Sequence, residues 1–178
     1  MELCVDLICF SQKDYLSLHQ TTRTMKFSIF TPFHQKNIQF LLELYASLKE
    51  QTFPDWEWVL VPNGEALTED LSFFRVDPRV KIYPFEYGFG KVGACKRYAC
   101  QQSQGEYLVE TDWDDLLTPD CLEKLNKEID KSNPDFVFSN FCQVNLGGET
   151  SNIWSPYYGW TYRDYNYKGK VLKETINP

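Results

Sequence analysis

The feature that most constrains this chain is a short β-forming run that ends abruptly in acidic residues. Residues 107–111 are rich in β-formers, and Asp112, Asp114 and Asp115 follow them directly. A strand in an open α/β sheet delivers the residues at its carboxyl end to the crevice where such sheets bind ligands. Carboxylates this close together repel one another, and a hard divalent cation relieves that repulsion. The run therefore fits a Mg²⁺ or Mn²⁺ site open to phosphate oxygens, and equally a solvated loop that caps the next helix.

Strands and helices alternate on both sides of this acidic run, which indicates an α/β fold. We expect strands at 27–31, 56–61, 80–83, 107–111 and 135–144, and helices at 38–51, 67–74, 92–102 and 118–132. The last of these helices has Thr118 as its expected cap and Pro119 as its first residue. The alternation predicts a mostly parallel sheet flanked by helices on both faces.

The domain boundaries follow from where this pattern begins and ends. We expect the core domain at 25–145 and an aromatic-rich segment at 146–178. Residues 1–24 show no regular spacing of apolar residues. That first segment is expected to be an N-terminal extension, with disorder as one interpretation. The late aromatic residues either line a sugar-acceptor cleft or pack over one edge of the sheet, and we favour packing.

Composition excludes several classes of function. A formal net charge of −7 argues against a general nucleic-acid or anionic-membrane surface. No apolar run reaches the roughly 18 residues that a membrane span needs. The cysteines include no C-x-x-C pair, which disfavours zinc, and buried thiols suit a reducing compartment, so we expect a cytoplasmic protein. These cysteines are Cys4, Cys9, Cys95, Cys100, Cys121 and Cys142.

Five motifs in register make the chain resemble the family 2 glycosyltransferases of the GT-A fold. They are Phe27-Ser28-Ile29-Phe30-Thr31-Pro32, Leu48-Lys49-Glu50-Gln51-Thr52-Phe53-Pro54-Asp55-Trp56-Glu57, Asp77-Pro78-Arg79-Val80, Gly105-Glu106-Tyr107 and Asp112-Trp113-Asp114-Asp115. The resemblance implies a Rossmann-like sheet that binds a nucleoside-diphosphate sugar at its carboxyl edge, with a UDP-sugar favoured. It also implies transfer of the sugar, with inversion, to an acceptor hydroxyl of a glycan or other molecule.

The same resemblance implies the residues that bind the donor. The exit of the first strand touches the nucleoside, and the helix after the Gly-rich loop places cations near the diphosphate or the base, although an ordinary solvated helix face remains the alternative. The implied donor-binding residues are Thr31, Pro32, Phe33, Asn63, Lys91, Lys96, Arg97, Asp112 and Trp113. Asn63 departs from the aspartate that usually recognises the base, so the identity of the base stays open.

The resemblance assigns the metal to the acidic run. Asp112 would contact the ribose and the metal, Asp114 would ligate the metal, and Asp115 would either ligate or orient. Trp113 is interpreted as a packing residue, with stacking on the donor as the second interpretation. A Mn²⁺ or Mg²⁺ ion would stabilise the departing nucleoside diphosphate.

The catalytic base is the least defined part of the prediction. A carboxylate base is required to deprotonate the acceptor hydroxyl, and Asp164 and Glu149 are the remaining candidates after the acidic run. For Asp164 we favour the alternative interpretation, a salt-bridged loop residue. We therefore expect the donor-binding half of a transferase, lacking the acceptor half. A non-catalytic nucleotide-sugar-binding or interaction module is the alternative. Nucleotidyl transfer ranks last because no basic Gly-rich loop follows the first strand.

Overall fold

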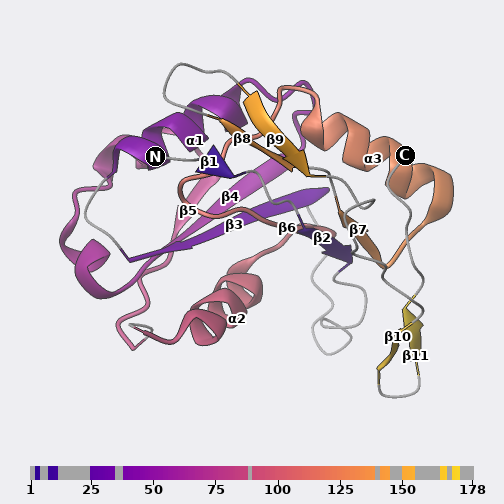
Figure 1. Ribbon diagram of the computed structural model, residues 1–178. Coiled ribbons are helices and arrows are strands. Elements are labelled where there is room, and N and C mark those ends of the chain that lie inside the picture. The colour runs from indigo at the N-terminus through magenta and orange to yellow at the C-terminus, as the bar shows by residue number, and fades with distance from the viewer. Residues whose placement is uncertain are drawn as a thin grey trace.

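A six-stranded sheet with the strand order β5-β4-β3-β6-β2-β7 carries the fold (Figure 1). The computed structural model describes residues 3–4, 8–11, 25–34, 38–87, 90–138, 141–144, 150–154, 165–167 and 170–172. The strands of the sheet are β2 (Ile8–Ser11), β3 (Phe27–Phe33), β4 (Trp56–Pro62), β5 (Val80–Ile82), β6 (Tyr107–Glu110) and β7 (Phe136–Phe138). The helices are α1 (Gln39–Lys49), α2 (Val92–Gln102) and α3 (Cys121–Ser132), with 3₁₀ helices η1 (Gly64–Thr68) and η2 (Ser72–Val76).

Smaller strand pairs lie outside this sheet. β1 (Leu3–Cys4), β8 (Phe141–Val144) and β9 (Thr150–Trp154) form a three-stranded antiparallel sheet. β10 (Tyr165–Tyr167) pairs with β11 (Lys170–Leu172) as an antiparallel ribbon. None of the described helices is long and apolar enough to cross a membrane.

The centre of the main sheet is parallel, as the alternation of strands and helices predicted. β3 pairs in parallel with β4 on one side and β6 on the other, and β4 pairs in parallel with β5. Parallel strands need crossover connections, and α1 and α2 supply two of them. The carboxyl ends of β3, β4 and β6 therefore meet at one edge of the sheet, which is where the expected ligand crevice should lie.

Helices cover both faces of the sheet, which confirms the predicted α/β architecture. Figure 1 shows α1 and α3 over one face and α2 over the other. Alternation along β3 sends Phe27 and Ile29 into the core cluster that contains α1 and α3 residues, whereas Phe30 packs in a second cluster with Ala99 of α2. The side that each residue of β3 and β6 faces is therefore set by its position in the strand.

The structure corrects three expectations about the elements. Residues 8–11 of the supposed N-terminal extension form β2, which pairs antiparallel with both β6 and β7. Helix α3 begins at Cys121 with Asp120 at its N-cap and has no side-chain cap bond; the Thr118 hydroxyl donates to Asp120 Oδ1. The single strand expected at 135–144 is two strands, β7 and β8, in different sheets.

The short helix expected at 67–74 is also different, since η1 and η2 replace it. The other expected elements are confirmed within a few residues, and α2 has the expected bounds of 92–102. Both candidates for the catalytic base, Asp164 and Glu149, lie outside the described residues, as do most of the late aromatic residues.

Candidate functional site

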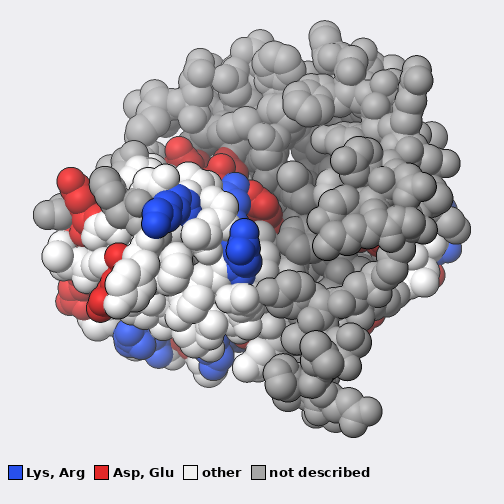
Figure 2. Space-filling model, turned by 90° about the horizontal axis from the view of Figure 1, so that it is seen from below, with Lys and Arg blue, Asp and Glu red and all other residues white. Residues whose placement is uncertain are grey.

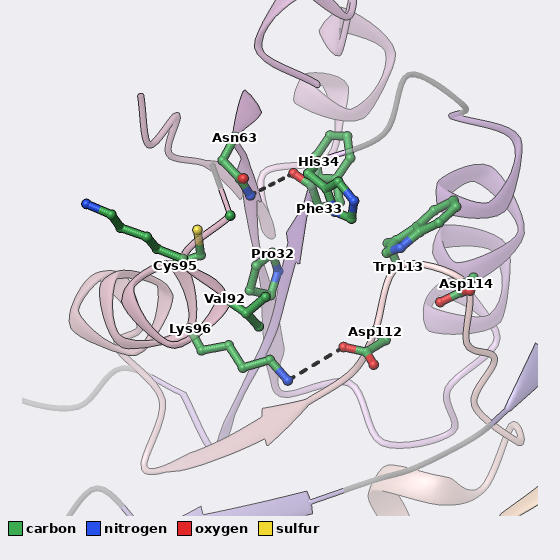
Figure 3. Close-up of a pocket in the computed structure, with 12 residues that line it drawn as sticks. Pro32, Phe33, His34, Asn63, Val92, Cys95, Lys96, Asp112, Trp113 and Asp114 are labelled. Carbon is green, nitrogen blue, oxygen red and sulfur yellow. Dashed lines mark hydrogen bonds and ion pairs between the residues drawn. The ribbon is translucent and has the colours of Figure 1, made fainter. Parts of the chain in front are cut away.

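A cavity of about 370 Å³ lies at the carboxyl edge of the sheet. The exits of β3, β4 and β6 and the start of α2 surround it (Figure 3). Its walls are formed by Pro32, Phe33, His34, Asn63, Gly90, Lys91, Val92, Cys95, Lys96, Asp112, Trp113 and Asp114. The cavity thus joins segments that are far apart in the sequence, as the parallel sheet requires.

Asn63 closes one end of the cavity and is held rigidly there. Its backbone N–H donates to the Phe33 carbonyl at 2.9 Å, and its side-chain Nδ2 donates to the same oxygen at 3.0 Å. Only 5% of Asn63 is exposed. One Nδ2–H is engaged by the backbone, so the side-chain amide of Asn63 keeps a second N–H donor and its Oδ1 acceptor.

The N-terminal turn of α2 forms a second wall. Lys91, Val92, Cys95 and Lys96 line the cavity, and their spacing places them on one side of the helix. The preceding Gly90 has a φ of +69°, a backbone conformation that favours glycine. A helix N-terminus with unpaired backbone N–H groups attracts anions, and two lysines at this end strengthen that attraction. Burial raises the pKa of the Cys95 thiol, so this cysteine stays in the neutral form.

The acidic run closes the opposite end of the cavity. Lys96 forms an ion pair and hydrogen bond with Glu110, the last residue of β6, and its Nζ lies 3.8 Å from Asp112 Oδ1. Figure 3 shows the lysine side chain directed toward Asp112. Burial lowers the pKa of Lys96, but the hydrogen bond and charge of Glu110, helped by Asp112 and Asp115, raise it on balance. Lys96 is therefore a fixed cation among carboxylates.

Asp114 and Asp115 have different environments although they are adjacent. Asp114 lines the cavity, and burial raises the pKa of its carboxyl above the ordinary value; a backbone hydrogen bond opposes this, and the charge of Asp112 adds to it. Asp115 is only 4% exposed, and its Oδ2 accepts a hydrogen bond from the Asp112 backbone N–H at 3.2 Å. Asp115 thus organises the turn that presents Asp112 and Asp114.

Trp113 forms the wall between the two cavity-lining carboxylates. Its ring meets Phe40 of α1 edge to face, with the centroids 5.2 Å apart. Phe40 is buried, so the indole is supported from the side of α1 while it also lines the cavity. Packing, the preferred interpretation from the sequence, is observed, and the contact of Trp113 with the cavity is compatible with the stacking role as well.

The donor atoms at the acidic end fit a hard divalent cation that shares its coordination with a ligand. Among the described residues, no group of three or more His, Cys, Asp or Glu side chains is arranged to hold a metal ion. Asp112 and Asp114 nevertheless offer carboxylate oxygens beside the same cavity, and Mg²⁺ is typically held by one or two carboxylates together with phosphate oxygens and water. The raised pKa of Asp114 means that its ionised form lacks stabilisation, which a cation would supply.

Three predicted site residues do not line the cavity. Thr31 faces the α1 side of the sheet, where its hydroxyl accepts from Trp58 Nε1 at 3.0 Å. Arg97 is exposed on α2 and Asp115 is buried in the turn. The remaining described candidates lie together at the cavity: Pro32, Phe33, Asn63, Lys91, Lys96, Asp112, Trp113 and Asp114.

Sequence reasoning missed His34, Val92, Cys95 and Glu110. His34 directly follows the strand exit that was identified, and Val92 and Cys95 share the helix face of Lys96, so helical spacing could have found them. Glu110 could have been identified from the alternation of the expected strand, because residues two positions apart in a strand face the same side and Asp112 follows two residues later. No signal in the sequence marks its pairing with Lys96.

The surface on the α2 side carries both signs of charge. Figure 2 shows that basic and acidic side chains are interspersed over the described part of this face. No large area of a single sign is visible there. The positive groups near the cavity are consequently local, as a site for a small anionic ligand requires, and the overall charge of −7 remains acidic.

Comparison with protein-family models matches residues 28–177 to "Glycosyl transferase family 2". The chain is 27% identical over 128 residues to the poly(ribitol-phosphate) β-N-acetylglucosaminyltransferase TarS of Staphylococcus aureus (strain Mu50), covering 70% of this chain and 22% of TarS. It is 24% identical over 142 residues to the glycosyltransferase GlyG of Streptococcus pneumoniae serotype 4, covering 78% of this chain and 45% of GlyG. The chain therefore spans less than half the length of either relative.

Solved structures of S. aureus TarS share the fold. The crystal structure of TarS 1–349 matches with a TM-score of 0.56 at 28% identity and covers 62% of this chain and 34% of that one. The structure of the same TarS fragment in complex with UDP-GlcNAc matches with a TM-score of 0.53 at 25% identity, covering 62% and 33%. The match to the family model extends over more than half of the chain, and the sheet has the arrangement of these GT-A neighbours. The chain belongs to glycosyl transferase family 2.

Proposed function

We propose that this protein is the donor-binding part of an inverting, metal-dependent glycosyltransferase that takes its sugar from a UDP-sugar and transfers it to an acceptor hydroxyl. The observation that carries the proposal is the cavity that brings Asn63, the α2 N-terminus, Asp112 and Asp114 together at the sheet edge. A nucleoside-diphosphate sugar has an order of groups that fits this arrangement: base, ribose, diphosphate and then the transferred sugar.

The acceptor oxygen of the Asn63 amide is compatible with uracil as the base. The Phe33 carbonyl accepts from one Nδ2–H, and the amide keeps Oδ1 as an acceptor. The N3–H of uracil is a donor that an amide oxygen can accept, whereas the N3 of cytosine is itself an acceptor. The crystal structures of the TarS neighbour with UDP and with UDP-GlcNAc make UDP-sugars the first donors to examine.

The two ends of the cavity would bind different groups of the donor, the diphosphate and the metal. Lys91 and the α2 N-terminus offer positive potential to the diphosphate, and Asp112 and Asp114 would hold the metal. Such a metal would neutralise charge on the departing diphosphate. The buried Asp115 holds the turn in place, which fixes the two ligating carboxylates relative to the sheet before any donor binds.

The acceptor side of the reaction rests on a carboxylate base that removes the hydroxyl proton as the oxygen attacks the sugar carbon from the face opposite the leaving group. Asp164 and Glu149 are the candidates for this base in the present chain, and both lie outside the described residues. Trp113, supported by Phe40, is the described aromatic wall nearest to the metal-binding end and is suited to contact the sugar.

The test is the release of UDP from UDP-GlcNAc and other UDP-sugars by the purified protein with Mn²⁺, with and without simple sugar acceptors. We expect UDP release that EDTA and Asp114→Asn each abolish. Arg97→Gln, an exposed helix residue away from the cavity, should retain the activity. Metal-dependent UDP binding with no turnover of any donor would favour the non-catalytic nucleotide-sugar module instead.

A further inference from the structure

The positively charged Lys96 side chain lies where it would repel a metal ion bound by Asp112 and Asp114. Its ammonium pairs with Glu110 and lies 3.8 Å from Asp112 Oδ1, the carboxylate that would ligate the metal. Glu110 is the last residue of β6 and has the parity of Leu108, which packs with Ala99 of α2, so strand alternation places Glu110 on the α2 side. Asp112 lies two residues beyond the strand, and its contact with Lys96 places it beside the same helix. The lysine side chain is 32% exposed, so water screens it only in part.

Two cations cannot share one carboxylate without cost. A metal that ligates Asp112 must displace or repel the Lys96 ammonium. The Asp112 side chain is 59% exposed, so water moderates this repulsion without removing it. Glu110 has two effects on this balance: it attracts any cation, and it holds Lys96 beside Asp112. A nucleoside diphosphate changes the balance, because its oxygens complete the coordination of the metal and its negative charge offsets the repulsion.

We infer that Lys96 is the resident counter-cation of the acidic run and that it makes metal binding depend on prior or simultaneous binding of the nucleotide. This inference rests on the proposed function, since it requires a metal site at Asp112 and Asp114. Lys96 acts here as a positioning residue through Asp112. In the protein without nucleotide it keeps the carboxylate neutralised and metal affinity low.

The experiment is a titration of the full chain with Mn²⁺ in the absence of nucleotide, with free Mn²⁺ counted by electron paramagnetic resonance. Lys96→Met should tighten Mn²⁺ binding by at least about threefold relative to the unsubstituted protein. Arg97→Met is the matched control: it removes the same charge from the next position of α2, but from an exposed side chain outside the cavity. It should leave Mn²⁺ affinity unchanged.

Testing Lys96→Met again in a Glu110→Gln protein separates the effect of the Lys96 charge from the effect of its ion-pair partner Glu110. Glu110→Gln should weaken Mn²⁺ binding, because it removes a negative charge and leaves Asp112 as the closest carboxylate to Lys96. Adding Lys96→Met to Glu110→Gln should restore tighter binding, and a protein in which Lys96 only supports the fold would not respond in this way. Thermal unfolding of each variant identifies any that are not folded.

The outcomes separate this inference from the proposed function. Equal Mn²⁺ affinity with and without Lys96, in both backgrounds, overturns the inference, as does a lack of Mn²⁺ binding by every variant. Repeating the titration with saturating UDP tests the function: tighter Mn²⁺ binding by the unsubstituted protein supports it. If UDP gives no Mn²⁺ binding in any variant, the proposed function fails as well.

Discussion

Gly105 occupies a position where the backbone of another strand leaves no room for a side chain. A Cβ added there would lie 2.4 Å from the Ser28 backbone N and 2.6 Å from the Phe27 carbonyl carbon. The Gly105 N–H also donates to Ser28 Oγ at 2.7 Å, and that hydroxyl donates to the buried Glu57 carboxylate. The glycine of the Gly-Glu-Tyr motif is therefore required by close packing against β3 at the start of β6.

Gly105→Ala should consequently destabilise the protein. We expect a loss of about 1–3 kcal/mol in the free energy of unfolding, because the contacts are with backbone atoms that cannot move aside. Urea unfolding followed by circular dichroism measures it. Gly93→Ala is the control, since nothing lies within 4 Å of its added Cβ and alanine favours the helix. An unchanged midpoint for Gly105→Ala would contradict the close packing.

Asp77 joins two parts of the α1 side of the fold. Its carboxylate accepts from Arg79 at 3.1 and 2.8 Å and from the Tyr45 hydroxyl of α1 at 3.2 Å. Arg79 in turn lies over the Trp56 ring at 3.9 Å from the ring centroid. The hydrogen bond from the Arg79 side chain is the largest cause that lowers the pKa of Asp77 below its ordinary value. Burial raises this pKa, while the Arg79 backbone N–H, the Arg79 charge and the Tyr45 hydroxyl lower it further.

This shift predicts the pH dependence of the stability. The folded pKa is lowered, so the contribution of Asp77 is fully present above the unfolded value near 3.9 and is lost as pH falls through the folded pKa. Asp77→Asn should cost about 1 kcal/mol at pH 7, a modest value because Arg79 is partly exposed and screened. The difference from the unsubstituted protein should shrink below about pH 4. Urea unfolding at several pH values measures it, and a difference that grows on acidification would contradict the assignment.

At the scale of elements, Gln51 ties the end of α1 to the segment between the acidic run and α3. Its Nε2 donates to the Ser47 and Thr118 carbonyls at 3.1 and 2.8 Å, and its Oε1 accepts from the Leu122 N–H at 3.1 Å. Gln51 is 8% exposed, and its bonds to Ser47 and Leu122 are buried, while the bond to Thr118 is partly buried. The glutamine of the Gln-Thr-Phe-Pro motif thus fixes the segment that follows Asp115.

Gln51→Ala should weaken both stability and nucleotide binding. Loss of the amide leaves the buried Leu122 N–H without its acceptor, which we expect to cost about 1–3 kcal/mol, and it loosens the segment that follows Asp112 and Asp114. Urea unfolding and UDP titration with Mn²⁺ measure the two effects. Asn126→Ala, which removes an exposed hydrogen bond to Asp130 on α3, is the control and should change neither. Unaltered UDP affinity in Gln51→Ala would contradict the coupling.

The elements that could be predicted from the sequence are those whose signal is local. The apolar run of β3, the helical spacing in α1 and the turn at Pro62-Asn63-Gly64 each identify their element without reference to the rest of the chain. β2 could not be found this way, because its place in the sheet comes from long-range pairing with β6 and β7. The same limit explains the missed division of 135–144, whose two halves pair with different sheets.

The candidate site shows a similar division at the residue level. The acidic run and the strand exits could be located from motifs, but motifs do not reveal which way a side chain faces. Thr31 faces the α1 side because it lies two and four residues after Ile29 and Phe27, which face that side of β3. Asp115 is buried, and its carboxylate accepts a hydrogen bond from the Asp112 backbone N–H. The Glu110–Lys96 pair depends on how α2 packs against β6, which only the tertiary structure provides.

For the whole molecule, the sheet-edge cavity is the central feature, and the proposed donor site is this cavity. Phe33, Asn63, the start of α2 and the acidic run come from four segments and meet only when the parallel sheet is complete. The chain spans 22% of TarS and 45% of GlyG. The proposed function predicts metal-dependent recognition of UDP by the purified chain.

The most direct test is a calorimetric titration of UDP into the purified protein with Mn²⁺ and again with EDTA. We expect saturable binding with the metal and a loss of at least about tenfold in affinity without it, because the diphosphate completes the coordination of the metal. Asp114→Asn should behave like EDTA, while Arg97→Gln should bind as the unsubstituted protein does. GDP and CDP should bind more weakly than UDP. Binding of equal strength with EDTA, or in Asp114→Asn, would contradict a metal-dependent UDP site.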